Sequence, residues 1–551
     1  MPKPLITINS FEAGIILDPT LPAANGFSFG EGVDIYSEPG YLKLSPSLSQ
    51  MTEATAPFDI KQPISWFVKY KGPDNLGKVL AYGVGGGTLY AYNWTVANAW
   101  SAIHLLSTTN ISSNQLGGLA EFNDEMFYAV DASLGRMSYT TLNGGITDVT
   151  ASIVLASNSN LGSPGSLIID SENIRYNNLY GSTGVNVVQR GARGSTAAAH
   201  NDAVRVYGFN DNYKIFARRD TLCHPMVVSD VGKLTIGDGR NIADLDTDGT
   251  FRDNALVLPS SERIRCLTRF SERIVAGTTK GNNLASDYPE GMLWIWDMTS
   301  TDPEQAFTLQ ENGVYALYSW RSVLMVFAGL AGNVYQFNGA AVQKVFQLPK
   351  QGHPANYGIV YPGAVSEFLG NLIFGYSAVA VGNEPDYSGI YALGSPEIGK
   401  PLALTAPYVL SPNKGTALAV FSLLPTDRKA FYTSWQNITA ITSVGVDELL
   451  PAGISNGYIE TQKYEIAVKN KPRLLKGVEI IAESLSASIG IKYKLDGATA
   501  YSSLDTIWAG NQADVLLGIA QRAKVIQLRF DMPNATLTAT QNPKIQTIKI
   551  Y

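Results

Sequence analysis

The chain has 551 residues, 16% of them charged, and a formal net charge of −6 at pH 7. A chain of this length can bury a large core and is expected to form more than one domain. The acidic balance argues against a general nucleic-acid-binding surface, because such surfaces need clustered lysine and arginine. It still allows a channel through which DNA slides, since a wall that is neutral or repels phosphate suits passage better than binding.

Turn residues and aromatic residues dominate the composition. Glycine (52 residues), proline (27) and tyrosine (28) are all frequent, which is typical of an all-β protein. The one helix that the pattern suggests is a short one at 511–518. Two cysteines, Cys223 and Cys266, provide no disulfide framework, which fits folding in a reducing cytosol. Neither a signal peptide nor a membrane span is predicted.

Residues 1–56 are predicted to form an extended N-terminal arm. Their short, turn-punctuated segments have little apolar periodicity of their own. Two roles remain open for this arm. It closes the ring of a propeller by supplying a strand from the opposite end of the chain, or it docks a neighbouring subunit.

Short strands led by a turn residue recur through residues 57–145 and 208–457. They begin at Gly87, Gly135, Gly232, Gly291, Gly332, Gly389 and Asn437. Most of them follow another short apolar strand, such as those at 273–277, 322–327 and 371–376. Strand pairs that repeat every roughly 40 to 60 residues are typical of a β-propeller. We therefore predict a propeller of six or seven blades.

The spacing of these strands doubles between Gly135 and Gly232, which indicates an insertion at 146–207. Short strands are expected there at 152–155, 165–170, 172–176, 186–190 and 203–207. Glycine-rich turns separate them. The segment is therefore predicted to be a small β module that protrudes from a blade, where insertions are tolerated.

Residues 458–551 are predicted to form a separate C-terminal β-sandwich. Their strands alternate apolar and polar residues, as in a sheet with one solvated face. Within 475–495 this alternation also specifies the register, because a slip by one residue would bury the lysines. Ile491 is therefore expected inside the domain and Lys492 on its surface.

One short string matches part of a metal-binding loop. Asp244, Asp246 and Asp248, followed by Gly249, resemble the opening of a calcium loop, but Ala255 stands where the closing glutamate belongs. The alternative is a polar hairpin turn. None of the four histidines has another ligand at metal spacing. We therefore predict no metal and no cofactor, and the three aspartates remain the calcium candidate.

No catalytic motif is present. Sialidase-like propellers carry Ser-x-Asp-x-Gly-x-x-Trp repeats, and the nearest string, at 286–294, has the wrong spacing. The sequence contains no P-loop and no protein-kinase motif set. We therefore predict that the chain is not an enzyme and has no catalytic residues. A glycan-binding or glycan-hydrolysing β-propeller is the alternative from another functional class.

Several strings resemble parts of phage tail proteins. The segment 11–14, followed by 32–40, resembles the opening of phage tail structural proteins, where it precedes a propeller, and 228–243 resembles paired strands of those propellers. The segment 188–200 is more specific. It ends in an Arg-Gly-x-x-Gly-Ser-x-Ala-Ala-x-His string, from Arg190 to His200, and resembles a β module that recurs in phage tail and virion proteins.

The order of these parts resembles that of the tail nozzle, or hub, proteins of short-tailed bacteriophages. The resemblance implies a structural virion subunit, assembled in the host bacterial cytoplasm, that forms a homo-oligomeric ring, expected to be a hexamer. The ring would continue the DNA ejection channel below a tail adaptor and would touch viral DNA transiently. It would also carry fibres, spikes or a plug protein. A tail-tip or fibre-attachment protein is the alternative within the same class.

Overall fold

The structure is a computed structural model. It describes residues 4–551 apart from 17–24, 52–61, 73–77, 84–86, 93–98, 106–115, 131, 193–194, 219–222, 282–287, 350–356, 380–386, 398, 413–417, 427–429, 438–442, 468–469, 484–487, 508–513, 518–520 and 534–541. Within the described ranges every regular element is a β-strand. No helix long and apolar enough to cross a membrane occurs in that part of the chain.

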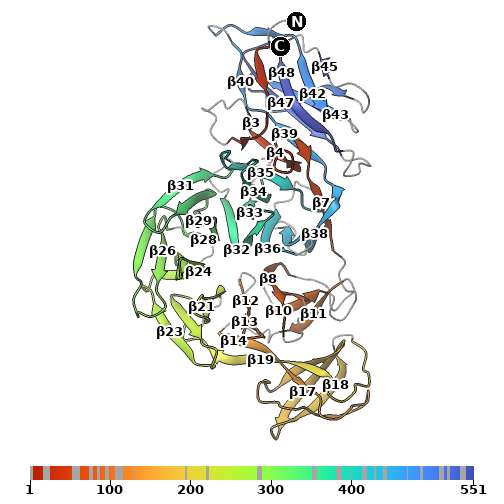
Figure 1. The fold of residues 1–551 in the computed structure, drawn as a ribbon, viewed down its shortest axis with the longest axis vertical. Helices are drawn as coiled ribbons and strands as arrows, with labels where there is room; N and C mark the ends of the chain where they lie inside the picture. The colour runs from red at the N-terminus through yellow and green to blue at the C-terminus, as the bar shows by residue number, and fades with distance from the viewer. Residues whose placement is uncertain are drawn as a thin grey trace.

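The centre of the molecule is a ring of seven four-stranded blades, counted over the described residues (Figure 1), and a parallel bridge between β32 and β36 joins the last two blades into one sheet. Blade 1 consists of β8 (Ile64–Tyr70), β9 (Lys78–Gly83), β10 (Thr88–Tyr92) and β11 (Trp100–Leu105), and blade 2 of β12 (Leu119–Phe122), β13 (Glu125–Val130), β14 (Ser133–Thr141) and β19 (Arg205–Ile215). Blade 3 consists of β20 (Met226–Val228), β21 (Leu234–Asp238), β22 (Asn241–Leu245) and β23 (Phe251–Val257), and blade 4 of β24 (Glu262–Phe270), β25 (Arg273–Lys280), β26 (Gly291–Trp296) and β27 (Gln305–Leu309). Blade 5 consists of β28 (Val314–Trp320), β29 (Val323–Ala328), β30 (Asn333–Phe337) and β31 (Val342–Gln347), and blade 6 of β32 (Tyr357–Phe368), β33 (Asn371–Val379), β34 (Gly389–Gly394) and β35 (Ala403–Tyr408). Blade 7 consists of β36 (Leu418–Pro425), β37 (Phe431–Asn437), β38 (Val444–Ile454) and β7 (Pro46–Gln50).

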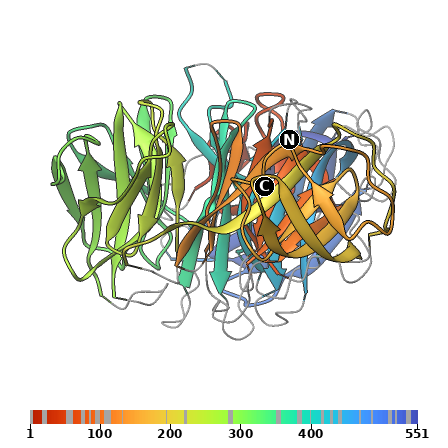
Figure 2. The same cartoon turned by 90° about the horizontal axis from the view of Figure 1, so that it is seen from below.

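The first strand of each blade is the innermost one. These strands contact one another in sequence around the ring, from β8 and β12 through to β36, which contacts β8 again. Seen from below, the strands of the blades run across the thickness of the ring (Figure 2). The fold class predicted from the sequence is therefore confirmed. The chain is all-β, and its propeller has seven blades over the described residues.

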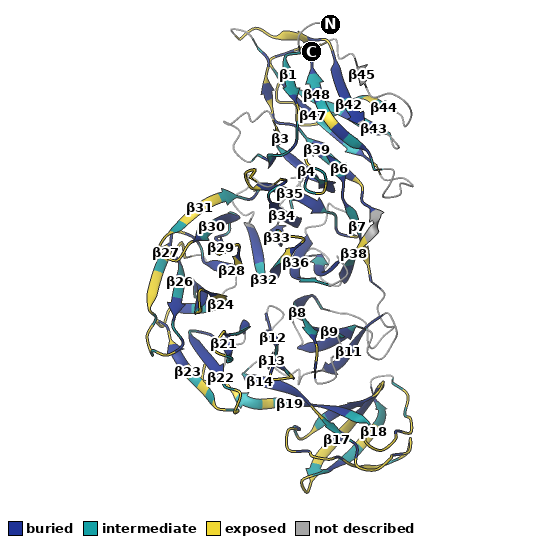
Figure 3. Cartoon of the chain, viewed as in Figure 1, coloured by how far each residue is buried: buried dark blue, intermediate teal, exposed yellow. Residues whose placement is uncertain are grey.

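Neighbouring blades cover both faces of each sheet, so the middle strands are apolar without strict alternation. In β25 the residues from 274 to 279 are all buried. Val275 and Leu293 of blade 4 pack in one cluster with Leu317 and Val326 of blade 5. The outer strands β27 and β31 are largely exposed (Figure 3). The core of the propeller is thus a series of apolar layers between blades.

The described part of the N-terminal arm joins the propeller to the C-terminal domain. β7 is the outermost strand of blade 7 and pairs antiparallel with β38, so the arm closes the ring. Further strands of the arm pair with blade 6 and with the C-terminal domain: β4 (Phe29–Glu31) with β35 and β39 (Gly457–Glu460), and β1 (Ile6–Ile8) with β48 (Lys544–Ile550). Docking of a neighbouring subunit by the arm stays a prediction, as do the predicted domain limits.

The insertion continues the sheet of blade 2. After β14 the chain forms β15 (Ser152–Val154), β16 (Gly165–Ile169), β17 (Glu172–Tyr180) and β18 (Gly184–Ala192), and it returns to the propeller in β19. Because β16 pairs with β19, the hydrogen-bonded sheet passes without a break from blade 2 into the module (Figure 1). Ile153, Ile174 and Val185 belong to the core of the module itself.

Two sheets face each other in the C-terminal sandwich. Their orders are β1–β48–β42–β45 and β44–β43–β47–β39, with β42 at Val478–Glu483, β43 at Ile489–Leu495, β44 at Ser502–Ile507, β45 at Asp514–Leu517 and β47 at Val525–Met532. Ile480 of the first sheet and Ile491 and Phe530 of the second lie in one buried cluster. The helix predicted at 511–518 is wrong, because residues 514–517 form β45 and pair with β42. The first and last strands of the described chain, β1 and β48, pair with each other in this domain (Figure 1).

Candidate functional site

The three aspartates of the calcium candidate lie at the hairpin between β22 and β23, where each has a different partner. Arg252 donates two hydrogen bonds to the Asp244 carboxylate, and Lys233 Nζ lies 3.0 Å from Asp246 Oδ2. Asp248 Oδ1 accepts a hydrogen bond of 2.8 Å from the backbone N–H of residue 250. Among the described residues no group of three or more acidic, histidine or cysteine side chains is arranged to hold a metal ion. Calcium binding at this turn stays a prediction.

One histidine lies in a serine–histidine–aspartate arrangement. His104 Nδ1 is 3.1 Å from Ser166 Oγ, and His104 Nε2 is 2.7 Å from Asp211 Oδ1. The Tyr128 hydroxyl also donates to Asp211, and the His104 ring stacks on Phe209. A nucleophile must be reachable by its substrate, but Ser166 is only 3% exposed. The arrangement instead fastens β16 of the module to β11 of blade 1.

The string from Arg190 to His200 closes around a buried glutamate that the sequence patterns did not single out. Arg190 donates to both carboxylate oxygens of Glu172, at 2.8 and 2.7 Å. The backbone N–H groups of Gly191 and Ala198 donate to it as well, and His200 Nε2 lies 2.8 Å away. Burial by itself would raise the pKa of Glu172, but these hydrogen bonds outweigh it and lower the pKa to about 2. This string therefore acts as a structural clamp within the module.

A cleft of about 720 Å³ lies between blade 7 and the C-terminal sandwich. Its floor is one row of residues across five hydrogen-bonded strands, namely Thr506 of β44, Gly490 of β43, Asp531 of β47, Tyr458 of β39 and Glu31 of β4. Residues directly opposed on neighbouring strands lie on the same face of a sheet. The row therefore lies on one face of the sheet, with polar side chains on both sides of Gly490.

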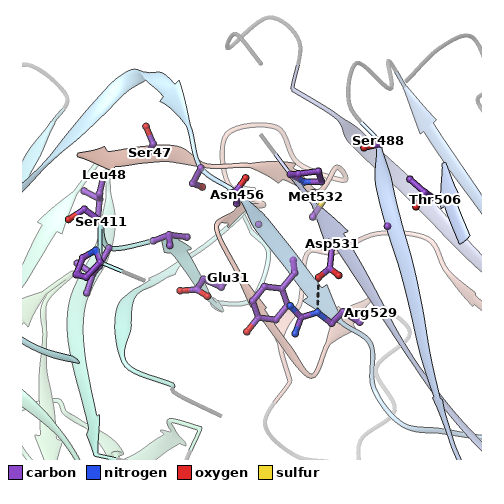
Figure 4. A pocket seen from close by; sticks show the side chains of 18 residues that line it. Glu31, Ser47, Leu48, Ser411, Asn456, Ser488, Thr506, Arg529, Asp531 and Met532 are labelled. Carbon is purple, nitrogen blue, oxygen red and sulfur yellow. Dashed lines mark hydrogen bonds and ion pairs between the residues drawn. The ribbon is translucent and has the colours of Figure 1, made fainter. Parts of the chain in front are cut away.

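The walls of the cleft come from both sides. β7 and the segment 409–412 contribute from the propeller, while Ser488 belongs to the C-terminal sandwich. Figure 4 shows Ser47 and Ser411 on the propeller side, with Glu31, Arg529 and Asp531 between them and Thr506. The cleft therefore lies at the junction of the two domains, and β4 and β7 of the arm contribute to its floor and walls.

Charged groups on the floor of the cleft are paired with one another. Arg529 donates to Asp531 at 2.7 Å and to Glu460 at 3.3 Å, and its guanidinium lies 3.8 Å from the centroid of the Tyr458 ring. Lys492 Nζ is 2.7 Å from the second oxygen of Asp531. Burial raises the pKa of Asp531, but Lys492 and Arg529 outweigh this effect, and the pKa is lowered. Asp531 is therefore an ionised hydrogen-bond acceptor at neutral pH.

Two further carboxylates, those of Glu262 and Glu290, belong to blade 4. Lys280 forms an ion pair with Glu290 and also faces Glu262, whose pKa is raised by burial. Glu262 accepts a hydrogen bond from the Thr278 hydroxyl. Glycoside hydrolysis uses two carboxyl groups in unlike environments, but Glu262 is only 3% exposed and is therefore not accessible to a substrate. The sequence could not place them together, because Glu262 begins β24 and Glu290 lies in the loop before β26.

No family model matches the chain, and no curated protein matches it. Similar solved structures include the phage phi92 endosialidase, with 11% sequence identity, a TM-score of 0.30, and coverage of 68% of this chain and 73% of that chain. A glycoside hydrolase family 43 arabinoxylan arabinofuranohydrolase from Bacillus subtilis has 10% identity and a TM-score of 0.24, covering 79% of this chain and 96% of that chain. The WD40 repeats of RRP9 have 9% identity and a TM-score of 0.37, covering 74% of this chain and all of that chain, 100%. At these identities and TM-scores the likeness supports no statement about the function of this chain.

The sequence prediction that the chain is not an enzyme is contradicted. It relied on the absence of catalytic motifs, whereas the structures that share the fold include glycoside hydrolases and an endosialidase. The likeness assigns no activity to this chain, and none of the structures named here is a tail nozzle or hub protein.

Proposed function

We propose that the chain is a structural subunit of a bacteriophage tail, in which the propeller holds two β appendages in fixed positions. The observation that carries this proposal is the continuity of hydrogen-bonded sheet. Blade 2 continues into the inserted module through β19 and β16, and blade 6 continues into the C-terminal sandwich through β35, β4 and β39. Surfaces on such appendages keep a defined geometry, as an assembling particle requires.

In the finer form of this proposal the subunit is a tail nozzle, or hub, protein that assembles into a hexameric ring around the DNA ejection channel. The module offers a surface for such contacts. Val149, Val154, Tyr180 and Val188 are exposed apolar side chains on it. Exposed apolar groups that gather on one part of a protein are typical of interaction sites. The tail adaptor, fibres, spikes and plug protein remain proposed partners.

The mass of the purified full chain in solution tests the ring. Native mass spectrometry should find an assembly of about six times 59.4 kDa. Val188→Glu on the module should reduce this assembly, whereas Val231→Glu on blade 3 should not. The two valines are a matched pair, because they are 61% and 62% exposed. A monomer at all concentrations would refute the ring, and a smaller closed oligomer would favour the tail-tip or fibre-attachment alternative.

A glycan-binding β-propeller is the second candidate function, and the cleft beside blade 7 favours it. A concave site of this size with convergent polar groups is the usual form of a small-molecule site. Its lining includes serine, threonine and asparagine side chains together with Glu31, Asp531 and Arg529. Retardation of the chain in gels that contain polysaccharide would support this function, and unchanged mobility across a broad polysaccharide panel would refute it.

A further inference from the structure

We infer that the cleft between blade 7 and the C-terminal sandwich binds an uncharged saccharide across the row Thr506, Gly490, Asp531, Tyr458 and Glu31. This inference rests on the second candidate function, and it specifies the place and the chemical class of the ligand. The five residues come from five neighbouring strands of one sheet, so their spacing is fixed by backbone hydrogen bonds. A rigid floor of this kind is already shaped before a ligand arrives.

The middle of the floor is open because Gly490 has no side chain. A Cβ atom at this position would meet only Cβ and the backbone oxygen of Asp531, at 3.8 and 3.9 Å, which is ordinary contact. The φ angle of Gly490 is outside the left-handed region, so the backbone does not require glycine there. The glycine therefore leaves free space above the sheet, next to the polar groups of Asp531 and Tyr458.

The polar groups that line the cleft match a ligand rich in hydroxyl groups. Carboxylates accept hydrogen bonds, whereas serine, threonine and asparagine side chains both donate and accept them. Glu31 and Asp531 supply the carboxylates, and Ser47, Ser411 and Thr506 are among the hydroxyl groups of the lining. A sugar hydroxyl is both a donor and an acceptor, so it can bind to either kind of group.

The charges argue against an anionic ligand. The lining carries two carboxylates and one cation, and the cation, Arg529, already donates to Asp531 and Glu460. An acidic sugar or a phosphate would therefore approach Glu31 and Asp531 without an unengaged positive group among the lining residues. Like charges at close range repel strongly in a partly buried site. An uncharged saccharide avoids this cost and still donates hydrogen bonds to the carboxylate of Asp531.

Affinity electrophoresis of the full chain tests the site, with dextran, galactomannan and arabinoxylan as neutral probes. Polysialic acid serves as the anionic probe and polylysine as the cationic one. At least one neutral polymer should retard the chain, and hydrogen–deuterium exchange should then show protection in 455–460 and 488–492. Gly490→Leu should weaken binding at least tenfold by filling the floor. Ser503→Leu, on the neighbouring strand but outside the cleft, is the matched control and should change binding less than twofold.

Asp531→Asn provides a second variant that keeps the side-chain shape, and it should also weaken binding at least tenfold. Far-ultraviolet circular dichroism checks that each variant is folded. Neutral binding that survives both cleft variants would overturn the assignment to this cleft while leaving a glycan-binding function in place. Retardation by polysialic acid or polylysine alone would overturn the charge argument. If no probe binds, both this inference and the glycan-binding candidate fail.

Discussion

Replacing Glu172 by glutamine should loosen the inserted module. The Glu172 side chain is 1% exposed and accepts hydrogen bonds from Arg190, His200 and two backbone N–H groups. Glutamine keeps the shape but turns one acceptor oxygen into a donor, and it leaves Arg190 without its opposite charge. Removing one partner of a buried ion pair costs about 3 to 5 kcal/mol.

The pKa of Glu172 provides a second measure of the same interaction. A carboxyl pKa lowered from 4.5 to about 2 corresponds to about 3 kcal/mol of stabilisation. Because the folded pKa lies below the unfolded one, this stability is fully present above pH 4.5 and is lost as the pH falls towards 2. Both measures predict that Glu172→Gln lowers the free energy of local unfolding of the module, here called its opening free energy, by about 3 kcal/mol at pH 7.

Hydrogen–deuterium exchange of β17 and β18 in the full chain measures this opening free energy. Amides in these strands should exchange roughly a hundredfold faster in Glu172→Gln than in the wild type. Glu304→Gln is the control, because Glu304 forms an ion pair with Arg273 in which both side chains are 39% exposed. It should change exchange in blade 4 by less than about 0.5 kcal/mol. Equal, small effects of the two variants would refute the clamp around Glu172.

Three further predictions concern the sandwich, the aspartate turn and DNA. Ile491→Ala should lower the free energy of unfolding by about 2 to 5 kcal/mol, because Ile491 is fully buried, whereas Lys492→Ala should change it by about 0.5 kcal/mol or less. If urea unfolding gave equal losses for the two variants, the predicted register of this strand would be contradicted. A calcium chelator should leave the melting temperature unchanged, because Asp244 and Asp246 already have cationic partners, and a shift that Asp246→Ala abolishes would show the opposite. Duplex DNA should bind more weakly than about 1 to 100 μM at physiological salt, given the net charge of −6; tight, salt-sensitive binding in a fluorescence assay would argue against a passive channel.

The repeat of glycine-led strands predicted the propeller but not the place of every strand within its blade. The strands that begin near Gly87, Gly291 and Gly332 are third strands of their blades, whereas the strand after Gly232 is a second strand, β21. A glycine marks a turn, and both second and third strands follow turns, so the pattern cannot tell them apart. Of the strand predicted at 437–441, only Asn437 is described, and it is the last residue of β37. Residues 438–442 lie outside the described residues.

Long-range pairing could not be predicted from the sequence. Ile6 of β1 pairs with Ile550, and this strand completes a sheet of the C-terminal sandwich, so the predicted segment 458–551 lacks one strand of that sheet. No local pattern in residues 6–8 indicates such a partner. The helix predicted at 511–518 failed for a related reason, because pairing of β45 with β42 overrides a local preference.

The residues of the cleft illustrate the same limit. Glu31, Tyr458 and Asp531 are single polar residues on separate strands, and each reads as an ordinary outward-facing position in its own segment. Only the sheet that joins the arm to β39 and β47 brings them into one row. By contrast, the three aspartates near residue 246 are close in sequence, so the sequence alone showed them as a group. Their partners Arg252 and Lys233 are known only from the folded hairpin.

The strand that closes the ring also sets the order of events during synthesis. β7 leaves the ribosome early, but its partner β38 is made roughly 400 residues later, which takes on the order of 20 to 80 s at about 5 to 20 residues per second. During that time β7 is an unpaired strand in a growing chain, next to other chains on the same messenger RNA. Where several copies grow together, β7 of one copy can meet β38 of a more advanced copy before its own β38 has been made. Exchange of this strand between copies is therefore the misassembly to which this topology is most exposed.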